Sequence, residues 1–191
     1  MTKTIGGENM KKLLIVVLVL VMAVSVLAGC NGTAVQTKTG LGTVISISKS
    51  KAATADADGL AQADVISAAV TVDQNGKIVS VDIDSAQVKV NFDATGALKT
   101  DPAAALKTKV ELGDDYGMKA YGNAVAEWYE QIASLEAWMV GKTLAEVKAM
   151  KTYEKDASHP MVPDEADLKT TVTIDVSSYV AAVEKAIANA K

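Results

Sequence analysis

Arginine is absent from this 191-residue sequence, and cysteine, histidine and phenylalanine occur once each. Every cationic side chain is therefore a lysine, so bidentate clamping of a phosphate or carboxylate by a guanidinium group is excluded. A single cysteine excludes an intramolecular disulfide, and one histidine leaves no Cys/His cluster for zinc. A Ser-His-Asp triad would depend on His159 alone, which precedes Pro160 in a polar stretch, and no Gly-x-Ser-x-Gly sequence occurs. An exported hydrolase or transferase is the weakest functional class for this chain.

The acidic residues give the chain a formal net charge of −4 at pH 7. An acidic chain is not expected to bind nucleic acid, because phosphate contacts require an excess of cations. The aspartates at 56, 58, 114 and 115 lack the spacing of an EF-hand loop, so we interpret them as solvated carboxylates. Gly40-Leu-Gly42 matches neither glycine-rich phosphate-binding pattern.

The N-terminal segment has the order of a secretory signal. Lys11 and Lys12 precede an apolar stretch from Leu13 to Leu27, which is shorter than the roughly 20 residues of a membrane span. Leu27-Ala-Gly-Cys30 resembles a bacterial lipobox, which implies cleavage after residue 29 and a diacylated Cys30. We therefore expect an extracytoplasmic protein anchored to the cell membrane; the alternative is a plain signal anchor with an incidental cysteine.

Residues 30–40 are small and polar and are expected to form the tether of this lipid-anchored protein, followed by a single domain over residues 41–191. Alternating and β-branched patterns predict about four antiparallel strands, with a hairpin at Asp73-Gln-Asn-Gly76. In the strand after this turn, strict alternation places Ile78 and Val81 on opposite faces. The predicted strand segments are 42–48, 63–72, 77–83 and 87–92.

The second half of the chain has helical periodicity. Apolar residues at steps of three and four predict one long amphipathic helix from Asp114 to Val140, which ends at Gly141. Thr143-Leu-Ala-Glu146 is a capping box that predicts a short helix. After a loop over residues 151–167 we expect a strand over residues 170–174, and then a C-terminal helix capped by Ser177. The fold class is therefore α+β: an antiparallel β-meander covered by a long amphipathic helix and a C-terminal helix.

Three segments in this order resemble the bacterial FMN-binding domain family. They are Val70-Thr-Val-Asp-Gln-Asn-Gly-Lys-Ile-Val-Ser-Val81, then Asp115-Tyr-Gly-Met118 with the Trp/Tyr helix after it, and a closing helix with Ala181-Ala-Val-Glu-Lys-Ala186. The resemblance covers about residues 65–186. Counting back from the closing helix, Thr170-Thr-Val-Thr173 falls where the Ser-Gly-Ala-Thr-like motif of the family lies.

The resemblance implies that the Thr173 hydroxyl carries FMN through a phosphoester formed by a separate flavin transferase, and that the flavin relays electrons to redox partner proteins outside the cytoplasm. The sequence departs from the motif, because Thr171 stands in place of glycine, Val172 in place of alanine, and Asp175 in place of Thr or Ser. Thr171 is a second candidate for contact with the flavin. The alternative is a flavin-free surface module of the same fold that binds another ligand or an envelope protein.

Aromatic residues lie along one face of the predicted long helix. Tyr121, Trp128 and Tyr129 have the spacing to stack against a planar ligand, and the same spacing is typical of a helix packed in a hydrophobic core.

Overall fold

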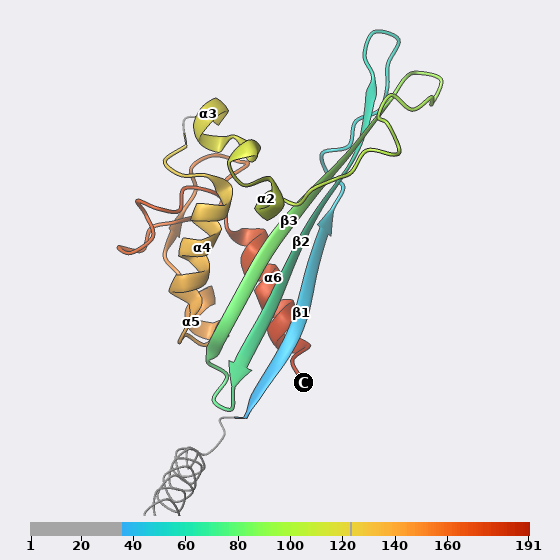
Figure 1. Ribbon diagram of the computed structural model, residues 1–191. Helices are drawn as coiled ribbons and strands as arrows, with labels where there is room; N and C mark the ends of the chain where they lie inside the picture. The colour runs from blue at the N-terminus through green and yellow to red at the C-terminus, as the bar shows by residue number, and fades with distance from the viewer. Residues whose placement is uncertain (1–35, 123) are drawn as a thin grey trace, which may run out of the picture. The chain divides into compact units, whose positions relative to one another are not determined.

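The computed structural model describes residues 36–122 and 124–191, and residues 37–191 form one compact unit. Three long strands form an antiparallel sheet in the order β1-β2-β3 (Figure 1). Their bounds are β1 Thr37–Ser46, β2 Gly59–Asp73 and β3 Ile78–Phe92. The predicted α+β class with an antiparallel meander is confirmed. Cys30 and residues 1–29, the segment predicted as a signal, lie outside the described residues.

The β2–β3 hairpin forms at the predicted turn. The Asp73 carboxylate accepts hydrogen bonds from the backbone N–H groups of Asn75 and Lys77, at 2.9 and 2.8 Å. Gly76 has a φ of 74°, a left-handed conformation that glycine adopts without steric penalty. A tight turn with these side chains is specified by local sequence, which explains why the prediction succeeds.

A β-bulge corrects the predicted alternation in β3. Val72 pairs with Ile78 whereas Thr71 pairs with Ser80, so Val79 is the extra residue. The extra residue shifts the alternation by one position, and Ile78 and Val81 both become buried while Val79 stays exposed. The prediction that Ile78 and Val81 face opposite sides is therefore wrong.

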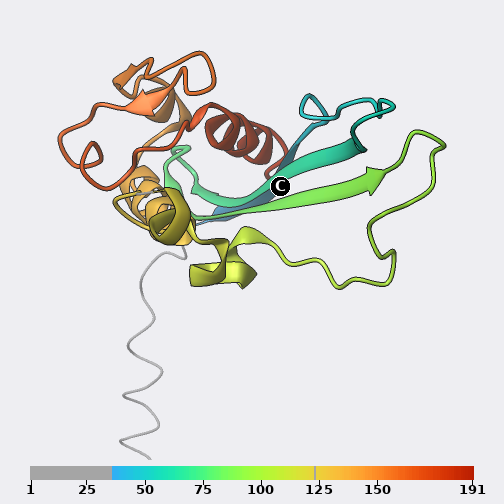
Figure 2. The same cartoon turned by 90° about the horizontal axis from the view of Figure 1, so that it is seen from above.

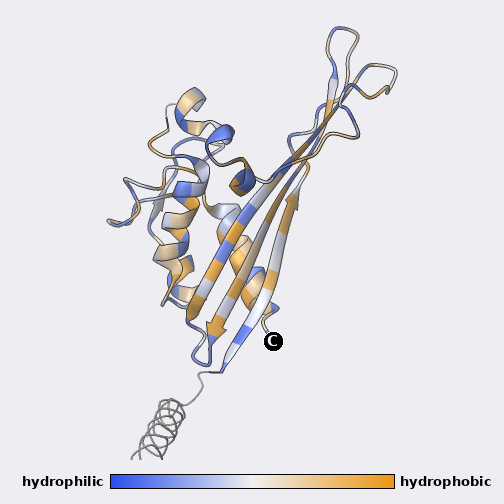
Figure 3. Ribbon diagram, viewed as in Figure 1, coloured by the Kyte–Doolittle hydropathy of each residue, from blue (hydrophilic) through white to orange (hydrophobic). Residues whose placement is uncertain are grey.

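The sheet has three strands because β3 continues without a break from Ile78 to Phe92. The two strand segments predicted over 77–83 and 87–92 are one strand, since Ser85 and Ala86 remain paired with Ile66 and Val65 of β2. Strand β1 begins at Thr37, inside the segment predicted as a tether. Apolar and polar residues alternate along the strands (Figure 3).

Helix α6, Ser177–Ala188, packs across β1 and β2 (Figures 1 and 2). Gly40 and Gly42 of β1 permit this close approach, because a Cβ at either position would overlap the backbone of α6 at Ala186 or Ala182. These glycines and the threonines around them gave the segment its linker-like composition. Over residues 37–42, this composition accompanies close packing of β1 against α6.

Side chains from α6 and the residue after it protect the edge of the sheet at β1. Lys185 Nζ donates to the Thr43 carbonyl and Asn189 Nδ2 to the Leu41 carbonyl, both at 2.9 Å. Backbone groups that point outward from an edge strand would otherwise be free to pair with another chain.

Short helices replace the predicted long helix over residues 114–140, and this prediction is wrong. Gly117 is left-handed with a φ of 76°, which ends the first turn. Glu127 then starts a new helix through a capping box with Glu130. The elements of this region are α2 Lys109–Leu112, the 3₁₀ helix η1 Gly113–Tyr116, α3 Met118–Gly122 and α4 Trp128–Met139.

The C-terminal third contains α5 Leu144–Lys148, β4 Thr152–Tyr153 and β5 Val162–Pro163 before α6. The Thr143–Glu146 capping box is confirmed. Residues 170–174 form a turn and an irregular segment, so the strand predicted there is wrong. The cap of α6 also differs from the prediction, because Asp175 accepts hydrogen bonds from the backbone N–H and the hydroxyl of Ser177.

The core lies between one face of the sheet and helices α4 and α6. Its largest fully buried side chains include Trp128, Ile132, Leu135, Met139 and Val70. Within the described ranges 36–122 and 124–191, no helix is long and apolar enough to cross a membrane.

Candidate functional site

A cavity of about 400 Å³ lies at one end of the core. Its walls come from the inward-facing residues of all three strands, from Lys109, Tyr116 and Met118, from Trp128 at the start of α4, and from the segments at 158–159 and 174–179. This volume falls within the roughly 300–1,000 Å³ typical of small-molecule sites. A second hollow, between the loops at 54–58 and 93–95, is formed by exposed short and acidic side chains with no buried polar group.

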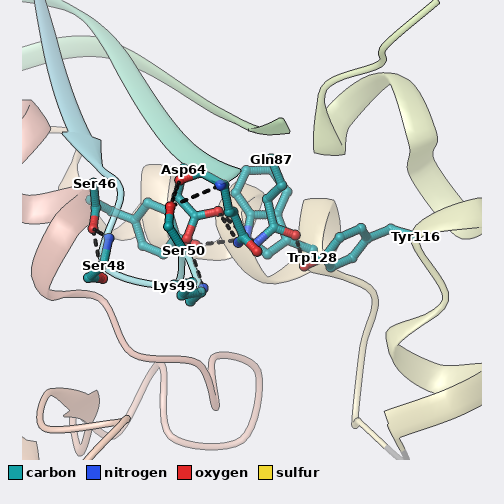
Figure 4. Close-up of polar contacts among 10 residues, drawn as sticks. Ser46, Ser48, Lys49, Ser50, Asp64, Gln87, Tyr116 and Trp128 are labelled. Atoms are coloured by element: carbon teal, nitrogen blue, oxygen red, sulfur yellow. Dashed lines mark hydrogen bonds and ion pairs between the residues drawn. The ribbon is translucent and has the colours of Figure 1, made fainter. Parts of the chain in front are cut away.

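Asp64 is the centre of a hydrogen-bonded network on the sheet side of the cavity (Figure 4). Its Oδ2 pairs with Lys49 Nζ at 2.9 Å, and its Oδ1 accepts from Gln62 Nε2 at 2.7 Å and Gln87 Nε2 at 3.2 Å. Tyr116 donates to Gln87 Oε1 at 3.2 Å. Burial raises the pKa of Asp64, but the three hydrogen bonds and the Lys49 charge outweigh it, so the pKa lies below its ordinary value. The Asp64 carboxylate is therefore ionised and fully engaged.

Lys109 is the buried cation of the cavity, with 9% of its surface exposed. Its Nζ lies 4.7 Å from the ring centroid of Tyr116 and 5.1 Å from that of Trp128, a cation–π arrangement. Burial, and after it repulsion from Lys49 and Lys89, lowers the pKa of Lys109 to about 8. Attraction from Asp64 and Asp84 opposes this shift but does not cancel it. Sequence reasoning missed this residue, because a lysine beside the capping-box residue Thr108 is expected to be solvated.

Trp128 and Tyr179 form the aromatic wall. Trp128 Nε1 donates to the Tyr179 hydroxyl at 2.9 Å, and the rings meet edge to face with centroids 5.9 Å apart. Burial raises the pKa of Tyr179 to about 12, so it stays neutral at physiological pH. Of the predicted aromatic stripe, only Trp128 lines the cavity. Tyr121 is 91% exposed, and Tyr129 donates to Asp114 instead.

Thr173 lies in the irregular segment before α6, and its neighbours Ile174 and Asp175 line the cavity. Its backbone N–H donates to Gln131 Oε1 at 2.9 Å, and its hydroxyl lies 3.4 Å from the same atom. That second distance exceeds the 2.5–3.0 Å usual for O–H···O bonds, so the hydroxyl is only weakly engaged. The side chain is half-buried and lies outside any strand, and Thr173 itself is not among the residues that line the cavity.

Thr171, the second predicted contact residue, is exposed and donates its hydroxyl to the Leu168 carbonyl at 3.2 Å. Gln131, which sequence reasoning also missed, is fully buried and bridges Thr173 to the Ala126 carbonyl. No spacing in the sequence distinguishes this glutamine from a solvated one. His159 lines the far wall and pairs with Asp156 at 2.8 Å. In the described part of the chain, no cluster of His, Cys, Asp or Glu has the arrangement of a metal site.

No protein-family profile and no solved structure matches the chain. Among curated proteins, the chain is similar to a chlorophenol reductase of Desulfitobacterium hafniense, with 34% identity over 99 residues. The match covers 44% of this chain and 29% of that reductase, so the chain corresponds to less than a third of the reductase's length.

Proposed function

We propose that this chain is a membrane-anchored extracytoplasmic lipoprotein with an FMN-binding-like domain that carries a flavin for electron transfer. The observation that carries the proposal is the cavity itself, which joins an aromatic wall and a buried cation beside the segment that holds Thr173. Planar aromatic rings pack against such aromatic surfaces. When bound, an isoalloxazine ring would accept and donate electrons, and the protein would position it and tune its potential.

Thr173 is the proposed attachment point. Both hydroxyls make long contacts, that of Thr173 to Gln131 Oε1 at 3.4 Å and that of Thr171 to the Leu168 carbonyl at 3.2 Å, so Thr173 is preferred for its position in the motif. The similarity to a protein named as a reductase is consistent with a redox role, although it concerns a short part of that protein. Attachment would require a flavin transferase, and electron transfer would require redox partners.

The second candidate is a flavin-free binding module with the same cavity. It is favoured by the exposed Thr171 side chain at the position where the FMN-binding family has glycine. Asp175 favours it too, because its carboxylate on the cavity wall repels an incoming phosphate.

Intact-mass measurement tests flavin attachment. The mature protein is produced together with a flavin transferase, and we expect a mass gain equal to FMN and flavin fluorescence in a denaturing gel. Thr173→Ala should abolish both signals, and Thr171→Ala should leave them unchanged. A gain that persists in Thr173→Ala would move the attachment to Thr170 or Thr171, and an unmodified wild-type mass would favour the flavin-free module.

The lipid anchor is tested separately. We expect the wild-type protein to fractionate with membranes and to incorporate labelled fatty acid, because two acyl chains hold a protein firmly on a bilayer. Cys30→Ala should lose the label and leave the membrane fraction. An unlabelled wild-type protein would contradict acylation of Cys30.

A further inference from the structure

The side chain of Lys109 is buried, its Nζ keeps access to the cavity, and this ammonium group has no anionic partner. Within residues 36–122 and 124–191, no carboxylate lies at ion-pair distance from its Nζ and no hydrogen bond from Nζ is formed. Its near neighbours are the Tyr116 and Trp128 rings. Buried charges in proteins are normally paired, so this arrangement calls for an explanation.

The other charged groups on the cavity wall are already satisfied. Asp64 is held by Lys49 and two glutamine amides. Asp175 accepts from the Met161 N–H with one oxygen and from Ser177 with the other. His159 is paired with Asp156. Among the described residues, Lys109 is therefore the one cation on the cavity wall that has no anionic partner and can pair with an external anion.

The residues around Lys109 also indicate what kind of molecule would carry the acidic group. The aromatic rings of Tyr116, Trp128 and Tyr179 line the cavity, and the cavity is too small for a macromolecule. We propose that the cavity binds a planar organic anion, an aromatic carboxylate or phosphate ester, whose acidic group pairs with the Nζ of Lys109. The proposal deepens the proposed function, since FMN belongs to this class, but it does not depend on attachment to Thr173.

A largely desolvated ammonium without an anionic partner destabilises the empty protein, and an apolar side chain of similar length removes that penalty. Lys109→Met should therefore lose ligand affinity while the empty protein keeps or gains thermal stability. A lysine with a purely structural role would give the opposite pattern, a loss of stability. Lys107→Met, at an exposed position two residues earlier, is the matched control.

The pairing also predicts how affinity depends on pH. The pKa of Lys109 is about 8, so the ammonium form that binds an anion is lost above this pH. The affinity should therefore fall by about tenfold per pH unit above about 8. The charged and titratable groups around Lys109 are Asp64 on β2, Lys49 after β1, Lys89 and Asp84 on β3, and Tyr116 on η1. Burial raises the pKa of Tyr116, which therefore stays neutral in this range.

Isothermal titration calorimetry with four probes tests the proposal on the full mature chain. Benzoate and phenyl phosphate distinguish a carboxylate from a phosphate, and FMN and riboflavin differ only by the phosphate. We expect at least one acid to bind the wild-type protein, and FMN to bind more tightly than riboflavin if phosphate is the preferred group. Lys109→Met should weaken that binding by about 10- to 100-fold, the range of one hydrogen bond to a charged group.

Each outcome separates this inference from the flavin proposal. Binding of benzoate or phenyl phosphate through Lys109 without binding of either flavin supports the anion site and argues against a flavin in the cavity. An FMN mass gain on Thr173 together with no binding of the acids supports the flavin proposal and overturns the anion site. Equal affinity of wild type and Lys109→Met, or no binding of any probe by the wild type, also overturns it.

Discussion

The contact between α6 and β1 depends on Gly42, and its substitution by alanine is a direct test of the fold. A Cβ at this position would overlap the Ala182 carbonyl oxygen and the Ala186 nitrogen, which are backbone atoms that cannot rotate away. Helix α6 would have to move outward by about 1 Å to restore ordinary contact. Overpacking of this kind typically costs about 1–3 kcal/mol, and we expect the upper end because the helix must move as a unit.

Chemical and thermal unfolding measure this effect. A loss of about 3 kcal/mol in the free energy of unfolding corresponds to a melting temperature lower by about 6–12 °C for a domain of this size. Gly122→Ala is the control, since a Cβ there would meet nothing within 4 Å. It should change the unfolding free energy by less than about 0.5 kcal/mol. If Gly42→Ala unfolds like the wild type, α6 does not pack on β1 through the glycines.

Two further predictions concern buried polar groups. Gln131→Leu leaves the Thr173 N–H and the Ala126 carbonyl without partners. The free energy of unfolding, measured in urea, should therefore fall by about 2–4 kcal/mol. Gln74→Leu in the exposed turn is the control and should change this free energy little. A wild-type-like Gln131→Leu would contradict the bridge. Burial raises the pKa of Glu136 from 4.5 to about 7, so the folded state holds this proton more tightly than the unfolded state, and stability should fall as pH rises from about 4.5 to about 7. Glu136→Gln should therefore be more stable than wild type by about 1–2 kcal/mol at pH 8 and equal to it at pH 4.5; the same difference at both values would refute the assignment.

Features specified by neighbouring residues were predictable from the sequence. The hairpin at Asp73–Lys77 and the capping box at Thr143–Glu146 both form as expected, because each depends on side chains within a few positions of one another. The C-terminal helix also forms as predicted. The α+β class was predictable because the spacing of apolar residues changes, from alternation in the first half of the chain to steps of three and four in the second half.

Features set by tertiary contacts were not predictable. The bulge at Thr71/Val72 changes the phase of β3 without any change in its alternating pattern. Helical spacing continues through Gly117, yet the chain turns there and restarts at Glu127. Apolar residues at steps of three and four do not distinguish one long helix from several short ones that are separated by a left-handed glycine or by a few non-helical residues.

The residues of the candidate site also divide into those that the sequence predicted and those that only the fold reveals. The sequence pointed to Trp128, which lies on the wall of the cavity, and to Thr173, which directly precedes the wall residues Ile174 and Asp175. It gave no signal for Lys109 or Gln131, because lysine and glutamine are ordinarily solvated and only the folded arrangement buries them.

Titration of Lys109 by NMR, observed at its ¹³Cε with and without saturating phenyl phosphate, tests the central claim most directly. The account predicts a pKa of about 8 in the free protein and a higher pKa in the complex, because an anion at Nζ stabilises the ammonium form. A free-protein pKa already near 10, or no change on addition of the ligand, would contradict it.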